Sequence, residues 1–302
     1  MGKNILITGG AGRLARYVAE ELKGDNNVTL FDLVTPDSTP TPWETDCKFV
    51  LGSLTDLGDC MRAITLSQAE VIIHLGAITH TTDQQPGKKM IQRRPEDTTM
   101  QVNVMGTYYL MDAARRIGTV KKVIFASSYY ALGLGGRLSG APYQVDYLPI
   151  DEDHPMRPED TYALSKVLGE EIIEAYCRAY GFKAVAFRLM GVVYPFREFE
   201  TNVPVPPNPD FKGGPVRTTW QYSDCRDIAY ACRLAMEKDL ENDFEPFYIV
   251  TDSTYPNDTK EVVEKSLPDL KEMAKNIKEG EGLITDAKLR KMLGYKPRHS
   301  WR

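Results

Sequence analysis

Two side chains with complementary acid–base chemistry lie four residues apart in the stretch TYALSKVLGEEIIEAY, residues 161–176. The spacing of the apolar residues predicts a helix from Thr161 to Tyr180, and on a helix Tyr162 and Lys166 project from one face. A phenol ordinarily loses its proton at a pH of about 10, and a neighbouring ammonium favours the phenolate and lowers that pKa. We therefore expect Tyr162 to take a proton from a substrate hydroxyl, with Lys166 lowering its pKa.

A serine at the end of a predicted strand is the third candidate. Residues 123–126 form an apolar run followed by Ser127 and Ser128, and Ser128 is placed to orient the same substrate hydroxyl. A Tyr and a Lys at this spacing are common on amphipathic helices, and alone they indicate only a helix surface. The interpretation as an active site therefore depends on the elements that precede it.

The first thirty-two residues supply those elements. The apolar run Ile5–Ile7 ends in a glycine cluster, which predicts a buried strand followed by a tight turn. Leu14, Val18 and Leu22 then recur at helical spacing, and residues 28–31 form a second apolar run that ends at Asp32. A strand, a glycine turn, a helix and a strand ending in an acid are typical of a dinucleotide-binding unit, although the glycine pattern alone also fits a simple turn.

Each part of this unit has a physical task. Gly9 and Gly12 allow backbone N–H groups to approach a pyrophosphate at the positive end of the helix, next to Arg13 and Leu14. Asp32 is placed to accept hydrogen bonds from the adenosine ribose. It would repel a 2′-phosphate, and residues 24–47 contain no Lys or Arg, so we expect NAD rather than NADP, with Arg13 as the one feature that favours NADP. With NAD as hydride acceptor, Lys166 is also expected to bind the nicotinamide ribose.

The composition indicates an ordinary globular protein of one large core or two lobes: 302 residues, 42% hydrophobic and 26% charged. A net charge of -5 argues against a nucleic-acid or acidic membrane partner. The absence of a long apolar run and a start that leads directly into a core strand predict a cytoplasmic protein without a membrane span or signal peptide. Five scattered cysteines suggest reduced thiols, and four dispersed histidines predict no metal site.

Strands and helices alternate along the rest of the chain. Further strands are expected at residues 48–51, 71–75 and 184–189, and further helices at residues 57–66 and 102–117. This rhythm predicts an α/β fold with a doubly wound parallel sheet, the Rossmann architecture. The polar segment from Thr79 to Thr99 is expected to be a solvated loop, with a substrate lid as the alternative.

The composition changes after Tyr194, where a run rich in proline and glycine begins. We expect an NAD-binding domain over residues 1–190 that carries Ser128, Tyr162 and Lys166. Residues 191–302 are expected to form mostly a small C-terminal substrate lobe, with some segments returning to the Rossmann core. Such a lobe would lie over the carboxyl edge of the sheet, where open α/β sheets bind ligands.

Several motifs resemble those of the extended short-chain dehydrogenase/reductase family, the NAD-dependent epimerases and dehydratases of sugars. The motifs are TGGAGRLA at residues 8–15, HLGA at 74–77, NVMGT at 103–107, YALSK at 162–166 and TDAKLRKMLGYKP at 285–297. The resemblance implies that Ser128, Tyr162 and Lys166 form a catalytic triad, that Asn103 supports the active-site helix, and that two long helices form a homodimer interface.

The resemblance also extends the expected cofactor site. It implies that Leu75, Gly76 and Ala77, after the fourth strand, contact the cofactor. Relatives carry an acidic–aliphatic pair at the adenine after the third strand, where this chain has Ser53 and Leu54. A serine hydroxyl still accepts a hydrogen bond from the adenine amino group.

Two departures concern the substrate. Relatives that act on nucleotide-linked sugars have an asparagine where this chain has Gly191, and an arginine that clamps the diphosphate where it has Trp220, although Arg217 and Arg226 are close in sequence. These departures favour a free sugar or sugar acid. The segment RLMGVVYPFR is similar to that of uronate dehydrogenases, so Arg197 is a candidate to bind a carboxylate, with an exposed loop arginine as the alternative.

The aromatic residues of the second half have two interpretations as well. Trp220 and Tyr222 could stack on a sugar ring, but aromatic residues in a small lobe more often belong to its core. Together these features predict an NAD-dependent enzyme that transfers hydride at a hydroxyl-bearing carbon of a sugar or sugar acid. The alternatives are a nucleotide-sugar epimerase and a non-catalytic NAD-binding regulatory protein. Simple dehydratase chemistry ranks lowest, because Tyr129 and Tyr130 follow Ser128 where such chemistry needs a carboxylate or equivalent.

Overall fold

A computed structural model describes residues 2–83, 95–134, 137–195 and 220–300 of the chain. Its main element is a seven-stranded sheet in the order β3-β2-β1-β4-β5-β6-β9, in which every neighbouring pair is parallel. The strands are β1 (Asn4–Thr8), β2 (Asn27–Asp32), β3 (Lys48–Leu51), β4 (Val71–His74), β5 (Lys122–Ser128), β6 (Lys183–Leu189) and β9 (Phe244–Ile249). The doubly wound parallel sheet predicted from the sequence is thus confirmed.

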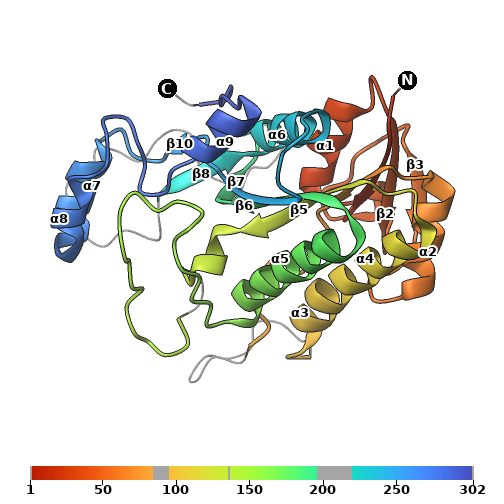
Figure 1. Cartoon of the computed structure of the whole chain (residues 1–302), viewed down its shortest axis with the longest axis horizontal. Coiled ribbons are helices and arrows are strands. Elements are labelled where there is room, and N and C mark those ends of the chain that lie inside the picture. The colour runs from red at the N-terminus through yellow and green to blue at the C-terminus, as the bar shows by residue number, and fades with distance from the viewer. Residues whose placement is uncertain (1, 84–94, 135–136, 196–219, 301–302) are drawn as a thin grey trace.

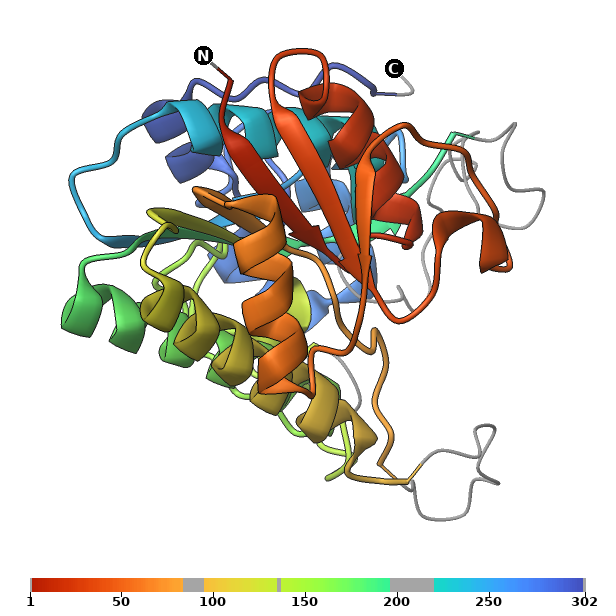
Figure 2. The same ribbon diagram turned by 90° about the vertical axis from the view of Figure 1, so that its right-hand side faces the viewer.

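Helices cover both faces of this sheet (Figures 1 and 2). One face carries α2 (Leu57–Ser67), α4 (Gly106–Ile117) and α5 (Thr161–Tyr180), and the other carries α1 (Arg13–Leu22), α6 (Cys225–Glu237) and α9 (Ala287–Leu293). Successive residues of a strand point to opposite faces, so Ile5 and Ile7 pack with the second group of helices and Leu6 with the first. The continuous apolar strands of the sequence reflect burial on both faces.

A smaller sheet and two short helices lie beyond the carboxyl edge. The small sheet contains β7 (Gly191–Val193), β8 (Gln221–Asp224) and β10 (Asp252–Ser253). The helices α7 (Thr259–Ser266) and α8 (Lys271–Ala274) lie at the end of the molecule opposite β2 and β3 (Figure 1). A third hydrophobic cluster lies in this region, and its members include Tyr129, Trp220, Tyr248, Val262 and Ile284. The domain division at residue 190 stays a prediction, since β9 and α6 follow it in sequence yet belong to the main layers.

The predicted helix over residues 102–117 differs in the structure. A short helix α3 (Thr98–Met100) leads into one π-helical segment, Gln101–Met105, and the regular helix α4 starts only at Gly106. A π-bulge inserts an extra residue into a helix and is frequent at functional sites. The inserted turn contains Asn103, whose role is described below.

Candidate functional site

A cavity of about 700 Å³ lies along the carboxyl ends of the parallel strands. It brings together the residues that the sequence predicts for the cofactor and for catalysis. The predicted residues that line it are Gly9, Gly12, Arg13, Leu14, Asp32, Ser53, Leu54, Leu75, Gly76, Ala77, Ser128, Tyr162 and Lys166.

The glycine loop after β1 forms one wall of this cavity. Gly9 has a φ of +68°, and a Cβ atom there would lie 2.7 Å from the backbone of Gly76, so neither its conformation nor its surroundings accept a side chain. The helix α1 begins after Gly12, which carries no side chain to cap the first turn. Its leading N–H groups are therefore suited to bind a pyrophosphate, and this cradle fits a dinucleotide.

Asp32 connects the end of β2 to the glycine loop. Its Oδ2 accepts a hydrogen bond of 3.0 Å from the backbone N–H of Ala11, and its Oδ1 accepts one of 2.6 Å from that of Leu33. Burial raises the pKa of Asp32, and the backbone hydrogen bonds oppose that rise. The carboxylate thus holds the loop while it faces the cavity, as a ribose acceptor must.

The adenine end predicted from the sequence lies beside Gly52. Ser53 donates its N–H to Asp59, and its hydroxyl lies 2.8 Å from that of Thr55. Leu54 packs so closely to Gly76 that a Cβ atom on that glycine would lie 2.6 Å from it. Leu54, in the loop that follows β3, thus contacts the loop that follows β4.

The catalytic candidates meet at the other end of the cavity. Ser128 ends β5, Tyr162 and Lys166 project from α5, and a hydrogen bond joins Ser128 to Tyr162. The Lys166 ammonium donates a hydrogen bond of 2.7 Å to the carbonyl oxygen of Ala126 and lies 5.7 Å from the centroid of the Tyr162 ring. The site thus places a hydroxyl, a phenol and an ammonium next to the predicted cofactor wall.

The acid–base properties of this trio differ from the expectation in one respect. Burial raises the pKa of Tyr162 to about 12, with the hydrogen bond from Ser128 acting in the opposite direction. The Lys166 ammonium instead donates its hydrogen bond to the carbonyl of Ala126. Burial also lowers the pKa of Lys166 to about 8, and the carboxylate of Glu170 opposes that change.

Asn103 lies in the π-helical segment and connects three parts of the site. Its side-chain amide donates 2.9 Å hydrogen bonds to the carbonyl of Ile78 and to the hydroxyl of Ser165, and its Oδ1 accepts one of 2.8 Å from the N–H of Ile78. Ser165 lies between Tyr162 and Lys166 on α5. This arrangement supports the assignment of Asn103 as a residue that holds the active-site helix.

The predicted substrate residues have different locations. Arg197 and Arg217 lie outside the described residues. Trp220 is 5% exposed and packs in the third hydrophobic cluster, in keeping with the alternative that it belongs to a core. Tyr222 is buried in β8, and Arg226 pairs with Asp224.

Sequence reasoning missed several residues that line the cavity. They are Thr79 after β4, Tyr130 after β5, and Met190, Val192 and Tyr194 after β6. The ring of Tyr130 lies edge-on to that of Tyr162 at 6.0 Å, and the guanidinium of Arg13 lies 4.5 Å from the centroid of the Tyr194 ring. Each of these residues follows a strand of the parallel sheet, so the rule that ligands bind at carboxyl ends could have identified them.

The sheet order, the glycine loop and the acid at the end of β2 define a dinucleotide-binding Rossmann protein. The model of the NAD dependent epimerase/dehydratase family matches residues 5–206, which is more than half of the chain. The chain therefore belongs to this family. NAD, the cofactor predicted from the sequence, is the cofactor in the family's description.

Relatives with assigned activities resemble the chain over part of its length. It is 31% identical over 192 residues to a putative UDP-glucose 4-epimerase of Methanocaldococcus jannaschii, covering 62% of this chain and 55% of that protein. It is 31% identical over 191 residues to a uronate dehydrogenase of Pseudomonas putida, covering 61% of this chain and 59% of that protein. The chain thus matches less than two thirds of the length of either relative.

Solved structures show the same fold over the whole chain. An epimerase of Methanothermobacter thermautotrophicus has a TM-score of 0.70 at 20% identity and covers 100% of this chain and 89% of its own. A mutated uronate dehydrogenase has a TM-score of 0.65 at 22% identity, covering 100% of this chain and 83% of its own. The predicted membership of the extended short-chain dehydrogenase/reductase family, with local similarity to uronate dehydrogenases, is confirmed. Within the described ranges, no helix combines the length and the apolar character needed to cross a membrane.

Proposed function

We propose that this protein is an NAD-dependent oxidoreductase that transfers hydride at a hydroxyl-bearing carbon of a sugar or sugar acid. The observation that carries this proposal is the meeting of Ser128, Tyr162 and Lys166 at one end of a cavity whose other walls fit a dinucleotide. NAD supplies the hydride acceptor when it is bound. A non-catalytic NAD-binding protein would have no use for this trio, and that alternative is disfavoured.

Each member of the trio has a separate task. Ser128 and Tyr162, joined by a hydrogen bond, hold the substrate hydroxyl between them, and Tyr162 takes its proton as the carbon loses hydride. Lys166 provides the positive charge beside Tyr162 and a donor for the cofactor ribose. Asn103 fixes α5 through Ser165, so that Tyr162 and Lys166 keep their positions.

The pKa values of Tyr162 and Lys166 predict how the rate of oxidation changes with pH. With a pKa of about 12, Tyr162 is a phenol at neutral pH, and its phenolate fraction rises tenfold for each unit of pH. Lys166 loses its charge above a pH of about 8. Oxidation is therefore expected to accelerate from neutral pH upward and to level off where Lys166 loses its proton.

The substrate class rests on the residues at the far end of the cavity. Gly191 lines the cavity where nucleotide-sugar enzymes carry an asparagine, which favours a small substrate without a nucleotide. Arg197 is proposed to bind the carboxylate of a sugar acid. A nucleotide-sugar epimerase is the second candidate, since the relative from M. jannaschii carries that name.

We also propose a cytoplasmic homodimer formed through α4 and α5. Three aromatic or aliphatic side chains on these helices are exposed, namely Tyr108, Leu164 and Tyr180. A dimer would remove them from water. Sedimentation of the purified protein should therefore give twice the chain mass, and sedimentation at the mass of one chain would contradict the dimer.

The function is tested by incubating the protein with NAD and a panel of free sugars, uronates and nucleotide sugars while recording absorbance at 340 nm. We expect continued formation of NADH with a free sugar or uronate. The same mixtures are then analysed for isomerised nucleotide sugars. An isomerised product without NADH would establish the epimerase instead, and silence in both assays would contradict an enzyme acting on these substrates.

A further inference from the structure

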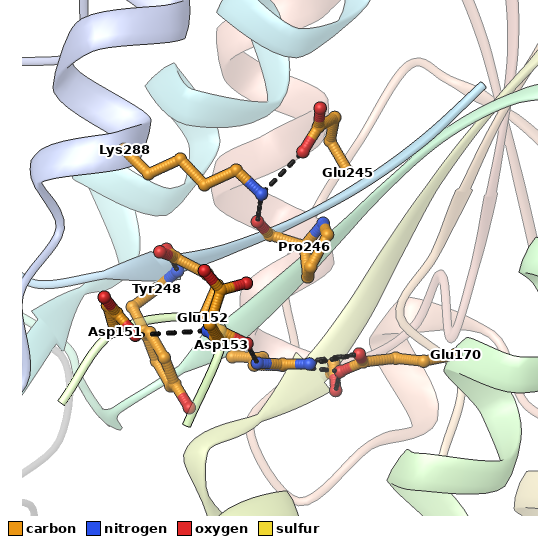
Figure 3. Close-up of polar contacts among 10 residues, drawn as sticks. Asp151, Glu152, Asp153, Glu170, Glu245, Pro246, Tyr248 and Lys288 are labelled. Carbon is orange, nitrogen blue, oxygen red and sulfur yellow. Dashed lines mark hydrogen bonds and ion pairs between the residues drawn. The ribbon is translucent and has the colours of Figure 1, made fainter. Parts of the chain in front are cut away.

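A buried ion pair lies directly beneath the catalytic end of the cavity. Glu170 of α5 and Arg188 of β6 are each 3% exposed. Two guanidinium nitrogens of Arg188 donate to the carboxylate of Glu170, with Nε 3.1 Å from Oε1 and Nη2 2.9 Å from Oε2. The third nitrogen, Nη1, donates to the carbonyl of Glu152 at 3.0 Å. Glu152 and Glu170, its two partners, are labelled in Figure 3. All three guanidinium nitrogens are thus occupied, as a buried charge requires.

Glu170 occupies the same face of α5 as the proposed catalytic residues. Tyr162, Lys166 and Glu170 follow one another at intervals of four residues. Its neighbour Gly169 lets the helix approach β5, since a Cβ atom there would lie 2.6 Å from the ring of Phe125. The close packing places the carboxylate of Glu170 within reach of the end of β5.

The carboxylate also holds the strand that carries the catalytic serine. The hydroxyl of Ser127 donates a hydrogen bond of 2.5 Å to Oε1 of Glu170. Ser127 lies in sequence between Ser128 and Ala126, and the carbonyl of Ala126 accepts the hydrogen bond from the Lys166 ammonium. One carboxylate therefore connects the helix of Tyr162 and Lys166 to the strand of Ser128.

The charge of Glu170 acts on Lys166 as well. Lys166 is 4% exposed, and burial favours its neutral form, whereas the carboxylate of Glu170 favours its charged form. Burial and the charge of Lys166 lower the pKa of His74, on β4, to about 3, so His74 carries no charge near neutral pH. Tyr162 is a neutral phenol, and the charge of Arg188 is already paired with Glu170.

We propose that Glu170 is a positioning residue of this site, which keeps Lys166 protonated and fixes the end of β5 on which Ser128 lies. This inference rests on the proposed function, in which a charged Lys166 is needed beside Tyr162. Without the negative charge of Glu170, burial would favour the neutral form of Lys166 unopposed. Lys166 would then release its proton at a lower pH.

The test is a pH titration of Lys166 by nuclear magnetic resonance, using protein labelled with ¹³C at lysine Cε. The resonance is assigned by its loss in Lys166→Arg. In Glu170→Gln, which keeps the hydrogen-bond acceptor and removes the charge, the midpoint is expected to fall by about one pH unit, a tenfold easier loss of the proton. An unchanged midpoint would overturn the proposal.

Two further variants keep the test decisive. Glu245→Gln is the matched control, because Glu245 is also a buried glutamate paired with a cation, Lys288, but on β9 (Figure 3). Its midpoint is expected to match that of the unmodified protein, and a fall equal to that of Glu170→Gln would contradict a specific role. If Glu170→Gln does not fold, the double variant Glu170→Leu/Arg188→Met removes both charges, and there too an unchanged midpoint overturns the proposal.

This measurement is independent of the substrate. Failure to find any turnover would contradict the proposed function while leaving the titration of Lys166 readable. A lowered midpoint together with absent turnover would show that Glu170 controls Lys166 in a protein whose function lies elsewhere. Failure of the proposed function and failure of the proposed role of Glu170 therefore give different results.

Discussion

At the cofactor end of the cavity the chain presents glycines, backbone N–H groups and the carboxylate of Asp32. At the catalytic end the buried charged side chains are those of Lys166, which lines the cavity, and of Glu170 and Arg188. The first arrangement comes from one continuous stretch of the sequence, residues 9–32. The second joins residues from β5, α5 and β6 that lie up to sixty-two positions apart (126 to 188). Binding the cofactor thus depends on local backbone shape, and the proposed catalysis depends on charges held far from water.

The largest effect is expected from removing one half of the buried pair. Arg188→Leu leaves Glu170 without its cation and frees the carbonyl of Glu152. A buried charge without its partner destabilises a protein by about 3–5 kcal/mol, so the free energy of unfolding in urea should fall by that amount. In the control Arg178→Ala, which removes an exposed pair with Glu174, the change should stay below about 0.5 kcal/mol. Equal effects of the two variants would contradict the contrast between buried and exposed charge.

Glu152, whose carbonyl accepts from Arg188, allows a second stability test at the catalytic end. In this test the expected effect changes with pH. Oε1 of Glu152 accepts a 2.8 Å hydrogen bond from the N–H of Tyr248, and burial raises the pKa of this carboxyl group from 4.5 to about 7. The folded state therefore holds its proton more tightly than the unfolded state, and the free energy of unfolding falls as pH rises from about 4.5 to about 7.

Glu152→Gln keeps a side-chain oxygen that can accept from the N–H of Tyr248 but cannot ionise. The fall in the free energy of unfolding with rising pH is therefore expected to disappear. We expect the variant to be more stable than the unmodified protein by an amount on the order of 3 kcal/mol at pH 8, and by less than about 1 kcal/mol at pH 5. Urea denaturation at the two pH values measures both differences. An equal gain in the free energy of unfolding at pH 5 and pH 8 would show that ionisation of the Glu152 carboxylate does not cause the pH dependence.

A smaller effect is expected at the cofactor end. Asp32→Asn removes the charge that accepts from Ala11 and Leu33 and that faces the proposed ribose position. Hydrogen bonds to charged groups contribute about 1.5–3 kcal/mol, so NAD affinity measured by calorimetry should weaken about tenfold to a hundredfold, while affinity for NADP weakens less. Asp37→Asn, on the neighbouring 3-10 turn, serves as the control with unchanged affinities. Unchanged selectivity in Asp32→Asn would remove the basis for expecting NAD over NADP.

The contrast between the two ends also explains what could be predicted from the sequence. The glycine loop, α1, β2 and Asp32 are consecutive, and their apolar periodicity and turn residues determine their structure locally. The same holds for Tyr162 and Lys166, which share one helix face. The fold class and the residues of the cofactor wall could therefore be predicted from the sequence.

The Glu170–Arg188 ion pair and the π-helical segment could not be predicted from local sequence patterns. The spacing places Glu170 on the helix face of Tyr162 and Lys166, but its ion-pair partner Arg188 comes from a strand that follows the helix, which no local pattern indicates. In the π-helical segment, Asn103 forms hydrogen bonds with Ile78, which lies twenty-five positions earlier in the sequence. The raised pKa of Tyr162 likewise comes from its burial in the folded chain, which the spacing of Tyr162 and Lys166 does not determine. Trp220 could equally have faced a substrate or a core, and only packing decides between them.

The most direct test of the account is the variant Tyr162→Phe, assayed for NADH formation at 340 nm and for NAD binding by calorimetry. The phenol is the proposed proton acceptor, so its loss should lower turnover by about a hundredfold to ten-thousandfold while NAD affinity changes only a few-fold. Tyr180→Phe, an exposed tyrosine on the same helix, should retain full turnover. Turnover in Tyr162→Phe equal to that of the unmodified protein would contradict the proposed catalytic role.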